Sequence, residues 1–323
     1  MPYVLWPFAL VGLVALVLVA ALAAPLRPPP VLDTIHKGAL AIPRDALPEL
    51  TRFQARDGTW LAYRFYAPVE GAGEKLAILA HGSSASSEEM HAIGRALAAS
   101  GVAAVAIDAR GHGASGSRGD IGYIGQLDDD LADLVAHLRK TLPTAKLLLI
   151  GHSSGGGFAS RIADGPLSRQ FERFILLSPY LGYRATTNRP NDGAGHWASV
   201  DYPRVVALMT LWRTFGVDWA QSLPTIGFAN APEARPFVTM EYSFRLMVNY
   251  GPTDDWQAPF RAQGGKIEVI AGENDELMNA PVYGPTLSPF GVRVTLVPGV
   301  DHMGIVYQPA ALEQIVAAAG RPS

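Results

Sequence analysis

A serine lies in a pattern that could make its hydroxyl a nucleophile. Gly151-His152-Ser153-Ser154-Gly155 matches G-x-S-x-G, with an apolar run at residues 145–150 before it and a stretch of helical composition at residues 155–163 after it. A nucleophile elbow needs this order of strand, sharp turn and helix, because the turn exposes the serine above the sheet. Ser153 is therefore the candidate nucleophile. The alternative is a connection rich in glycine and serine that carries no chemistry.

One histidine lies where a base for this serine is needed. Hydrolases with such an elbow carry the nucleophile, the acid and the histidine in that chain order. The chain has eight histidines, and His302 is the only one after His196. It follows the apolar run at residues 292–297 by a few positions. His302 is therefore the candidate base that takes the serine proton.

Several carboxylates compete to hold this imidazole. Asp275 follows the apolar run at residues 266–271, and Glu273, Glu276 and Asp301 lie nearby in the sequence. Asp301 adjoins the histidine in the chain and is poorly placed to bond the ring of its own neighbour. Asp275 is the preferred acid, and the two glutamates remain alternatives.

A second glycine pattern, at residues 111–116, reads G-x-G-x-x-G and is followed by acids at residues 128–130. A dinucleotide site needs the glycines to open a helix and the acid to end the next strand. Residues 117–120 instead continue as a loop, and the acids open a helix. The chain also lacks cysteine and the H-E-x-x-H pattern. We therefore expect no nucleotide, no metal and no other cofactor.

The elements that would position these residues are short apolar runs alternating with amphipathic stretches. Strands are expected at residues 75–80, 102–108, 145–150, 174–178, 266–271 and 292–297, and helices at 88–100, 124–142, 155–163 and 310–319. Apolar runs separated by helices predict parallel strands buried on both faces. Right-handed crossovers then give a doubly wound, mostly parallel sheet of the α/β class. A hairpin at residues 51–67 is expected before it.

The alternation lapses between residues 183 and 265, which is too long for a plain loop. The region holds four tryptophans, and residues 202–215 and 238–248 have helical spacing. We expect residues 183–265 to be an inserted helical cap, with further helices of the main domain as the alternative. Residues 50–182 and 266–323 then form the α/β core.

The N-terminal residues are almost wholly apolar, with no charged side chain from Pro2 to Pro25. About 20 apolar residues can cross a bilayer. We expect residues 1–25 to be a single-pass membrane anchor, with the side of the catalytic domain undecided. The alternative is a cleaved signal peptide and a secreted protein, but the stretch is long for a signal and lacks a positive start. Residues 26–49, with prolines at 28–30, are expected to be a linker.

The composition limits the partners. The net charge is −3, with no long run of one sign, which argues against nucleic acid. The expected partners are a small-molecule or lipid ester and, through the N-terminal helix, a membrane. Protein partners are not predicted.

These motifs together resemble the α/β-hydrolase superfamily and, within it, the monoglyceride-lipase and lysophospholipase-like branch of the serine aminopeptidase S33 type. The resemblance runs from about residue 50 to the C terminus and is weakest across the insertion. The residues that carry it are His81-Gly82-Ser83, Asp108 to Gly113, Asp129-Asp130-Leu131, the elbow, Gly272 to Asp275 and Asp301-His302.

The resemblance implies an oxyanion hole with two backbone donors. One is the N–H of Ser154, which follows the nucleophile, and the other comes from the loop at residues 81–83. We assign the second donor to the N–H of Ser83. Many relatives carry Met or Gln at the position of Ser154, a small departure because only the backbone N–H is needed.

The implied reaction is the transfer of an acyl group to water through an acyl-enzyme, without a cofactor. The expected substrate is a carboxylic ester with an apolar or monoacyl-lipid acyl part. Amide or peptide hydrolysis uses the same triad and is one alternative. A non-catalytic ligand-binding protein of hydrolase fold is another, although such a protein does not need all three triad residues.

Overall fold

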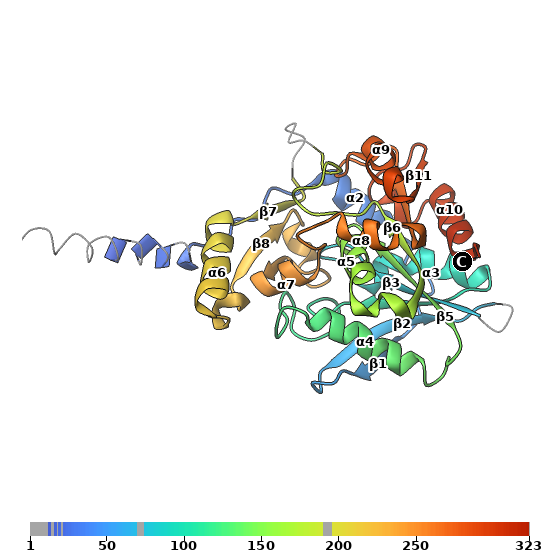
Figure 1. Ribbon diagram of the computed structural model, residues 1–323, viewed down its shortest axis with the longest axis horizontal. Coiled ribbons are helices and arrows are strands. Elements are labelled where there is room, and N and C mark those ends of the chain that lie inside the picture. Colours follow the sequence, from blue (N-terminus) through green and yellow to red (C-terminus); the bar gives the residue numbers. More distant parts are fainter. Residues whose placement is uncertain are drawn as a thin grey trace, which may run out of the picture.

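The computed structural model describes residues 12–13, 16–17, 19–20, 22–69, 74–189 and 196–322 (Figure 1). Its centre is a sheet of eight strands in the order β1-β2-β4-β3-β5-β6-β10-β11. The strands are β1 (Leu50–Gln54), β2 (Trp60–Tyr66), β3 (Lys75–Ala80), β4 (Ala103–Asp108), β5 (Lys146–His152), β6 (Phe171–Leu177), β10 (Ile267–Gly272) and β11 (Arg293–Val297). Only the pairings of β1 with β2 and of β2 with β4 are antiparallel. The predicted mostly parallel sheet is confirmed.

Both faces of this sheet are buried, as the continuous apolar runs predict. Side chains alternate between the faces of a strand. On β3, Leu76 and Ile78 join one hydrophobic cluster, whereas Ala77 and Leu79 join the other. The strand is apolar throughout because both of its faces meet helices.

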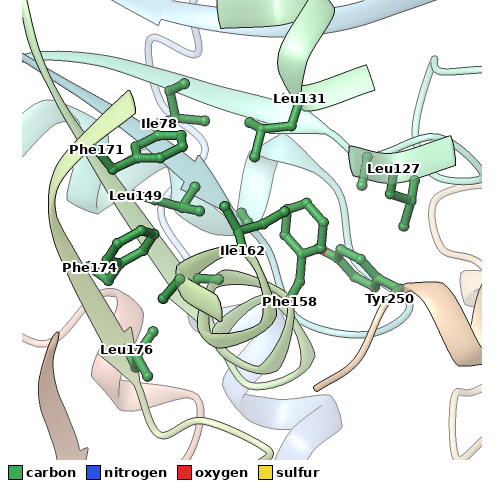
Figure 2. Close-up of a cluster of buried hydrophobic side chains, with 14 of the residues drawn as sticks. Ile78, Leu127, Leu131, Leu149, Phe158, Ile162, Phe171, Phe174, Leu176 and Tyr250 are labelled. Atoms are coloured by element: carbon green, nitrogen blue, oxygen red, sulfur yellow. The ribbon is translucent and has the colours of Figure 1, made fainter. Parts of the chain in front are cut away.

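Helices cover each face in turn, which is the doubly wound arrangement. The first cluster packs under α4 (Gln126–Leu138), α5 (Ser154–Asp164) and α8 (Ala258–Gln263). Figure 2 shows part of it, with Leu131, Phe158 and Phe174 converging between the sheet and these helices. The second cluster packs under α2 (Asp33–Ala41), α3 (His91–Ala99) and α10 (Pro309–Gly320). The shorter helices of the core are η2 (Ser87–Met90), η3 (Pro166–Gln170), η6 (Gly264–Lys266), η7 (Ala280–Val282), α9 (Tyr283–Leu287), η8 (Ser288–Phe290) and η9 (Gly304–Val306).

The inserted region contains strands as well as helices. Before α8, its elements are β7 (Ala198–Val200), α6 (Tyr202–Phe215), η4 (Trp219–Ser222), β8 (Pro224–Phe228), η5 (Pro232–Ala234), β9 (Glu241–Ser243) and α7 (Phe244–Asn249). The strands form a separate antiparallel sheet in the order β7-β8-β9, to one side of the central sheet (Figure 1). The helices of the expected cap are thus accompanied by strands that the sequence did not predict. Strands of three to five residues are too short to show a period of their own.

The prediction of a membrane-anchored protein, with residues 1–25 as a single-pass helix, is wrong. Residues 1–11, 14, 15, 18 and 21 of that segment lie outside the described residues. Across the part of the chain that the structure describes, no helix combines the length and the apolarity that a membrane crossing needs. About 20 apolar residues in one helix are required, and the described helical residues of this segment end at Ala23.

The segment that follows packs along the molecule, although we expect a linker at residues 26–49 from the sequence. The Leu32 N–H donates to the Ala229 carbonyl at 3.2 Å. On α2, Ile35 is buried in the second core cluster. A Cβ at Gly38 would lie 2.5 Å from the Met303 Cβ, so this helix is closely packed beside the loop that carries His302.

Candidate active site

The serine predicted as nucleophile lies at a sharp turn between β5 and α5. Ser153 has φ +51° and ψ −115°, a conformation that is unfavourable for a residue with a side chain. The flanking glycines permit the turn. A Cβ at Gly151 would lie 2.1 Å from the Gly155 carbonyl oxygen, and a Cβ at Gly155 would lie 2.4 Å from that of His81. The strained turn at Ser153 has the strand–turn–helix form of a nucleophile elbow.

His302 and Asp275 meet at the same edge of the sheet. They follow β11 and β10, which are parallel neighbours, so both loops leave from the carboxyl ends of their strands. The Nδ1 atom of His302 lies 2.9 Å from Oδ2 and 3.0 Å from Oδ1 of Asp275. The Asp275 carboxylate also accepts hydrogen bonds from the N–H groups of Leu277 and Met278, at 2.9 and 2.7 Å. These donors fix the carboxylate against the imidazole.

The two partners shift each other's pKa. Burial raises the pKa of Asp275, but the neighbouring His302 outweighs this, and the pKa lies below its ordinary value. Burial lowers the pKa of His302, but the charge of Asp275 and its hydrogen bond outweigh this, and the pKa is raised. A buried carboxylate that favours the imidazolium is what a base needs when it takes a proton during the reaction.

The other candidate acids have different partners. Glu276 accepts a hydrogen bond at 2.9 Å from the backbone N–H of His302. Asp301 accepts one at 2.6 Å from the backbone N–H of Gly304. Glu273 is exposed. Of the four carboxylates considered from the sequence, Asp275 is therefore the one that contacts the imidazole ring.

The loop after β3 offers one free amide to the site. The Gly82 N–H donates to the Glu89 carboxylate, and the Ser84 N–H donates to the Tyr242 hydroxyl at 2.6 Å. Among the described residues, none accepts a hydrogen bond from the N–H of Ser83 or from that of Ser154 at the start of α5. These are the two amides that the sequence assigns to the oxyanion hole.

Side chains from the inserted region hold this loop, and sequence reasoning missed them. The Trp197 indole N–H donates to the Ser83 hydroxyl at 2.7 Å. The Tyr250 hydroxyl donates to the His81 carbonyl oxygen. The Ser84 hydroxyl donates to the Thr239 carbonyl oxygen at 2.6 Å and accepts from the Asn230 amide at 2.7 Å. The aromatic richness of the insertion is the one sequence signal that pointed toward such contacts.

The glycine-rich loop at residues 111–116 has a structural role. The Asp108 carboxylate accepts hydrogen bonds at 2.7 and 2.8 Å from the N–H groups of Ser87 and Ala114, and a Cβ at Gly113 would lie 2.2 Å from it. Asp130 pairs with Arg110 at 2.6 Å. The loop and its acids therefore fix each other rather than forming a phosphate cradle.

The chain is similar to known hydrolases in sequence. Residues 72–220 match the family described as serine aminopeptidase, S33. A monoacylglycerol lipase of Mycolicibacterium smegmatis is 32% identical over 83 residues, which are 25% of this chain and 30% of that protein. The match thus spans less than a third of the length of this curated relative.

Solved structures extend the likeness to nearly the whole fold. A soluble variant of monoglyceride lipase from Saccharomyces cerevisiae has a TM-score of 0.60 at 17% identity, covering 86% of this chain and 96% of that one. The monoacylglycerol lipase of Paleococcus ferrophilus has a TM-score of 0.53 at 19% identity, covering 80% and 99%. The α/β-hydrolase fold is thereby confirmed, and so is the resemblance to the S33-type, monoglyceride-lipase-like branch.

Proposed function

We propose that this chain of α/β-hydrolase fold is a carboxylic ester hydrolase with Ser153 as nucleophile, His302 as base and Asp275 as acid. One observation carries the proposal. A buried Asp275–His302 pair lies at the same edge of the sheet as a strained serine turn. β5, β6, β10 and β11 are parallel neighbours, so the loops after them share one edge. The likeness to monoacylglycerol lipases supports an ester hydrolase.

In this mechanism the hydrogen bond to Asp275 fixes the tautomer of His302. Its Nδ1 donates to the carboxylate, so Nε2 is free to take the Ser153 proton. The serine oxygen then attacks the ester carbonyl, and the resulting oxyanion accepts from the N–H groups of Ser83 and Ser154. The leaving alcohol takes the proton from Nε2. Water then gives a proton to Nε2 and attacks the acyl-enzyme, which releases the carboxylic acid and returns the proton to Ser153.

The proposed substrate is an ester with an apolar or monoacyl acyl part. The names of the similar lipases support this class, whereas the description of the matched family as an aminopeptidase supports amide hydrolysis as the second candidate. Matched ester and amide substrates of graded acyl length separate the two, because the same triad serves both. A preference in kcat/KM for the amides would reverse the proposal on substrate class.

A fluorophosphonate probe tests the nucleophile directly. We expect covalent labelling of the wild-type protein and none of Ser153→Ala, with ester hydrolysis reduced by about 10⁵-fold or more, since the nucleophile is lost. The matched control is Ser160→Ala. Ser160 lies on α5, is fully buried and donates to the Gly157 carbonyl at 2.8 Å. Labelling of the Ser153→Ala protein at the wild-type rate would exclude Ser153, and an unlabelled wild type would exclude the hydrolase.

A further inference from the structure

One buried carboxylate outside the triad lies where three active-site loops meet. Glu89 belongs to η2, and only 6% of its surface is exposed. Its Oε2 accepts a hydrogen bond from the N–H of Gly82, in the loop that carries Ser83. The same oxygen lies 3.2 Å from Nδ1 of His152, the residue before the nucleophile. Glu89 thus connects the loop after β3, called the oxyanion loop below (residues 81–84), to the nucleophile elbow.

His152 extends this connection to the loop that carries the base. Its Nε2 lies 3.1 Å from the carbonyl oxygen of His302, and the two imidazole rings are 4.8 Å apart between centroids. Both histidines and Glu89 are buried. The chain of contacts therefore runs from Gly82 through Glu89 and His152 to the backbone of His302.

The hydrogen-bond partners of His152 and Glu89 determine which of their atoms face each other. A carbonyl oxygen can only accept, so Nε2 of His152 carries a hydrogen toward His302. Its Nδ1 then faces Oε2 of Glu89 at 3.2 Å inside the protein. Burial raises the pKa of Glu89, but His152 and the Gly82 N–H outweigh this and hold the pKa below its ordinary value. Glu89 is therefore a buried carboxylate that lies directly against the His152 ring.

The neighbouring titratable groups have partners of their own. His81 accepts from the Ala109 N–H through Nε2 at 3.2 Å and donates through Nδ1 to the Gly82 carbonyl, so it is neutral. Asp108 is occupied by the N–H groups of Ser87 and Ala114. On the other side, Asp275 faces the His302 ring and Glu276 its backbone N–H. The pair of Glu89 and His152 is thus separate from the triad pair.

We propose that Glu89 is a positioning residue of the active site, which through His152 holds the oxyanion loop, the nucleophile elbow and the His302 backbone in one fixed relation. The inference rests on the proposed hydrolase function. Glu89 itself touches no reacting atom. Its contribution is to the geometry in which the Ser83 N–H, the Ser153 hydroxyl and the His302 ring act together, and misplacement by about 1 Å in such a site costs up to about 10²-fold in rate.

The test compares Glu89→Gln with Glu88→Gln. The first variant keeps the side-chain volume but removes the charge that pairs with His152. The second changes the adjacent residue, whose half-exposed side chain faces Arg44 and Arg64 at 3.4 Å. For Glu89→Gln we expect kcat to fall about 10- to 100-fold with KM within about threefold, since positioning acts on the transition state. Glu88→Gln should match the wild type.

Three further readouts separate positioning from a general loss of stability. Affinity for a trifluoromethyl ketone, which forms the tetrahedral adduct, should fall with kcat, whereas affinity for the carboxylic acid product should not. The double variant Glu89→Gln, His152→Gln should lose no more than Glu89→Gln alone, because the two residues act as one unit. Glu89→Asp, which keeps the charge, should recover part of the rate. It also serves as the test if Glu89→Gln does not fold.

A kcat of Glu89→Gln within twofold of wild type, or additive losses in the double variant, would overturn the inference. Proton NMR of the catalytically inactive Ser153→Ala protein gives a check that does not depend on activity. We expect the imidazole signals of His152 to shift in the Glu89→Gln background and to stay in place in the Glu88→Gln background. This shift in a protein whose wild type neither labels nor hydrolyses would reject the proposed function while keeping the pair, and the lack of a shift would reject the pair.

Discussion

The two sides of the candidate site are built by different parts of the chain. Asp275 and His302 follow neighbouring parallel strands of the core, and their contact follows from the sheet order. The oxyanion loop at Ser83 and Ser84 is instead held by side chains of the inserted region. The acid–base pair is therefore brought together by the topology of the sheet, and Thr187 and Arg189 of the insertion bond only the backbone of its loop. The oxyanion loop depends more on the insertion, beside its contact with Glu89 of η2.

A substitution that removes a hydrogen bond to the oxyanion loop costs free energy. Each neutral hydrogen bond contributes about 0.5–1.5 kcal/mol net, but a buried donor left without its acceptor costs about 1–3 kcal/mol. Trp197, Tyr242 and Tyr250 all bond to the oxyanion loop. The inserted region therefore positions part of the site, because the contacts that attach it to the core also fix the loop that supplies the Ser83 N–H.

The largest expected effect comes from the acid–base side. Asp275→Asn should lower kcat by about 10⁴-fold, because the amide no longer holds the tautomer that leaves Nε2 free. Glu273→Gln is the control, since Glu273 is exposed at the same loop. Steady-state kinetics on a soluble ester measure both. Equal kinetics for the two variants would place the acid elsewhere.

On the oxyanion side, Tyr242→Phe should lower kcat about 10- to 100-fold. The change leaves the buried Ser84 N–H without its acceptor and frees the loop beside Ser83. Tyr66→Phe is matched to it, because Tyr66 is also buried and its hydroxyl bonds the His91 ring at 3.0 Å, away from the oxyanion loop. Both variants should lose thermal stability, Tyr242→Phe the more because its hydroxyl also bonds the His112 ring at 2.6 Å, and only Tyr242→Phe should lose rate. Equal rate losses would mean that the comparison between the two sides is mistaken.

The packing of α2 beside His302 predicts an effect on stability. Gly38→Ala places a methyl group against Met303, where a Cβ would lie 2.5 Å from its neighbour. Such overpacking costs about 1–3 kcal/mol in the free energy of unfolding. The control is Leu40→Ala on the same helix, where Leu40 is 66% exposed. Urea unfolding measures both, and an unchanged midpoint for Gly38→Ala would show that α2 does not pack tightly on this loop.

The pH dependence gives the smallest effect and distinguishes the two sides. Because Asp275 raises the pKa of His302, the acidic limb of kcat/KM should have its midpoint above about 6.5, with activity falling as the pH falls through it. Asp275→Asn should lower this midpoint, and Tyr242→Phe should leave it unchanged. The stability from this raised pKa is complete below about pH 6.5 and is lost as the pH rises through the folded value. A wild-type midpoint below that of free histidine would contradict the pair.

The sequence by itself determined the framework. Continuous apolar runs predicted the parallel sheet, and the elbow pattern together with chain order predicted Ser153, Asp275 and His302 as the residues of interest. These predictions depend on information that is local in the chain, namely the period of apolar residues and the position of a residue just after a strand. Parallel neighbouring strands then bring such residues to one edge, as for Asp275 and His302.

Only the tertiary structure decided what surrounds that framework. The contact of Ser84 with Tyr242 joins residues 158 positions apart, and no periodicity in either segment reports on the other. The pairing of Glu89 with His152 is equally non-local, and a surface glutamate has the same sequence signature as a buried one. The apolar N-terminal stretch misled for the same reason. Hydropathy reports the composition of a segment and not its partners. Leu22 packs against the cluster around Leu208, whereas the large apolar side chains described before it are exposed (Leu13, Leu16, Val17 and Val19).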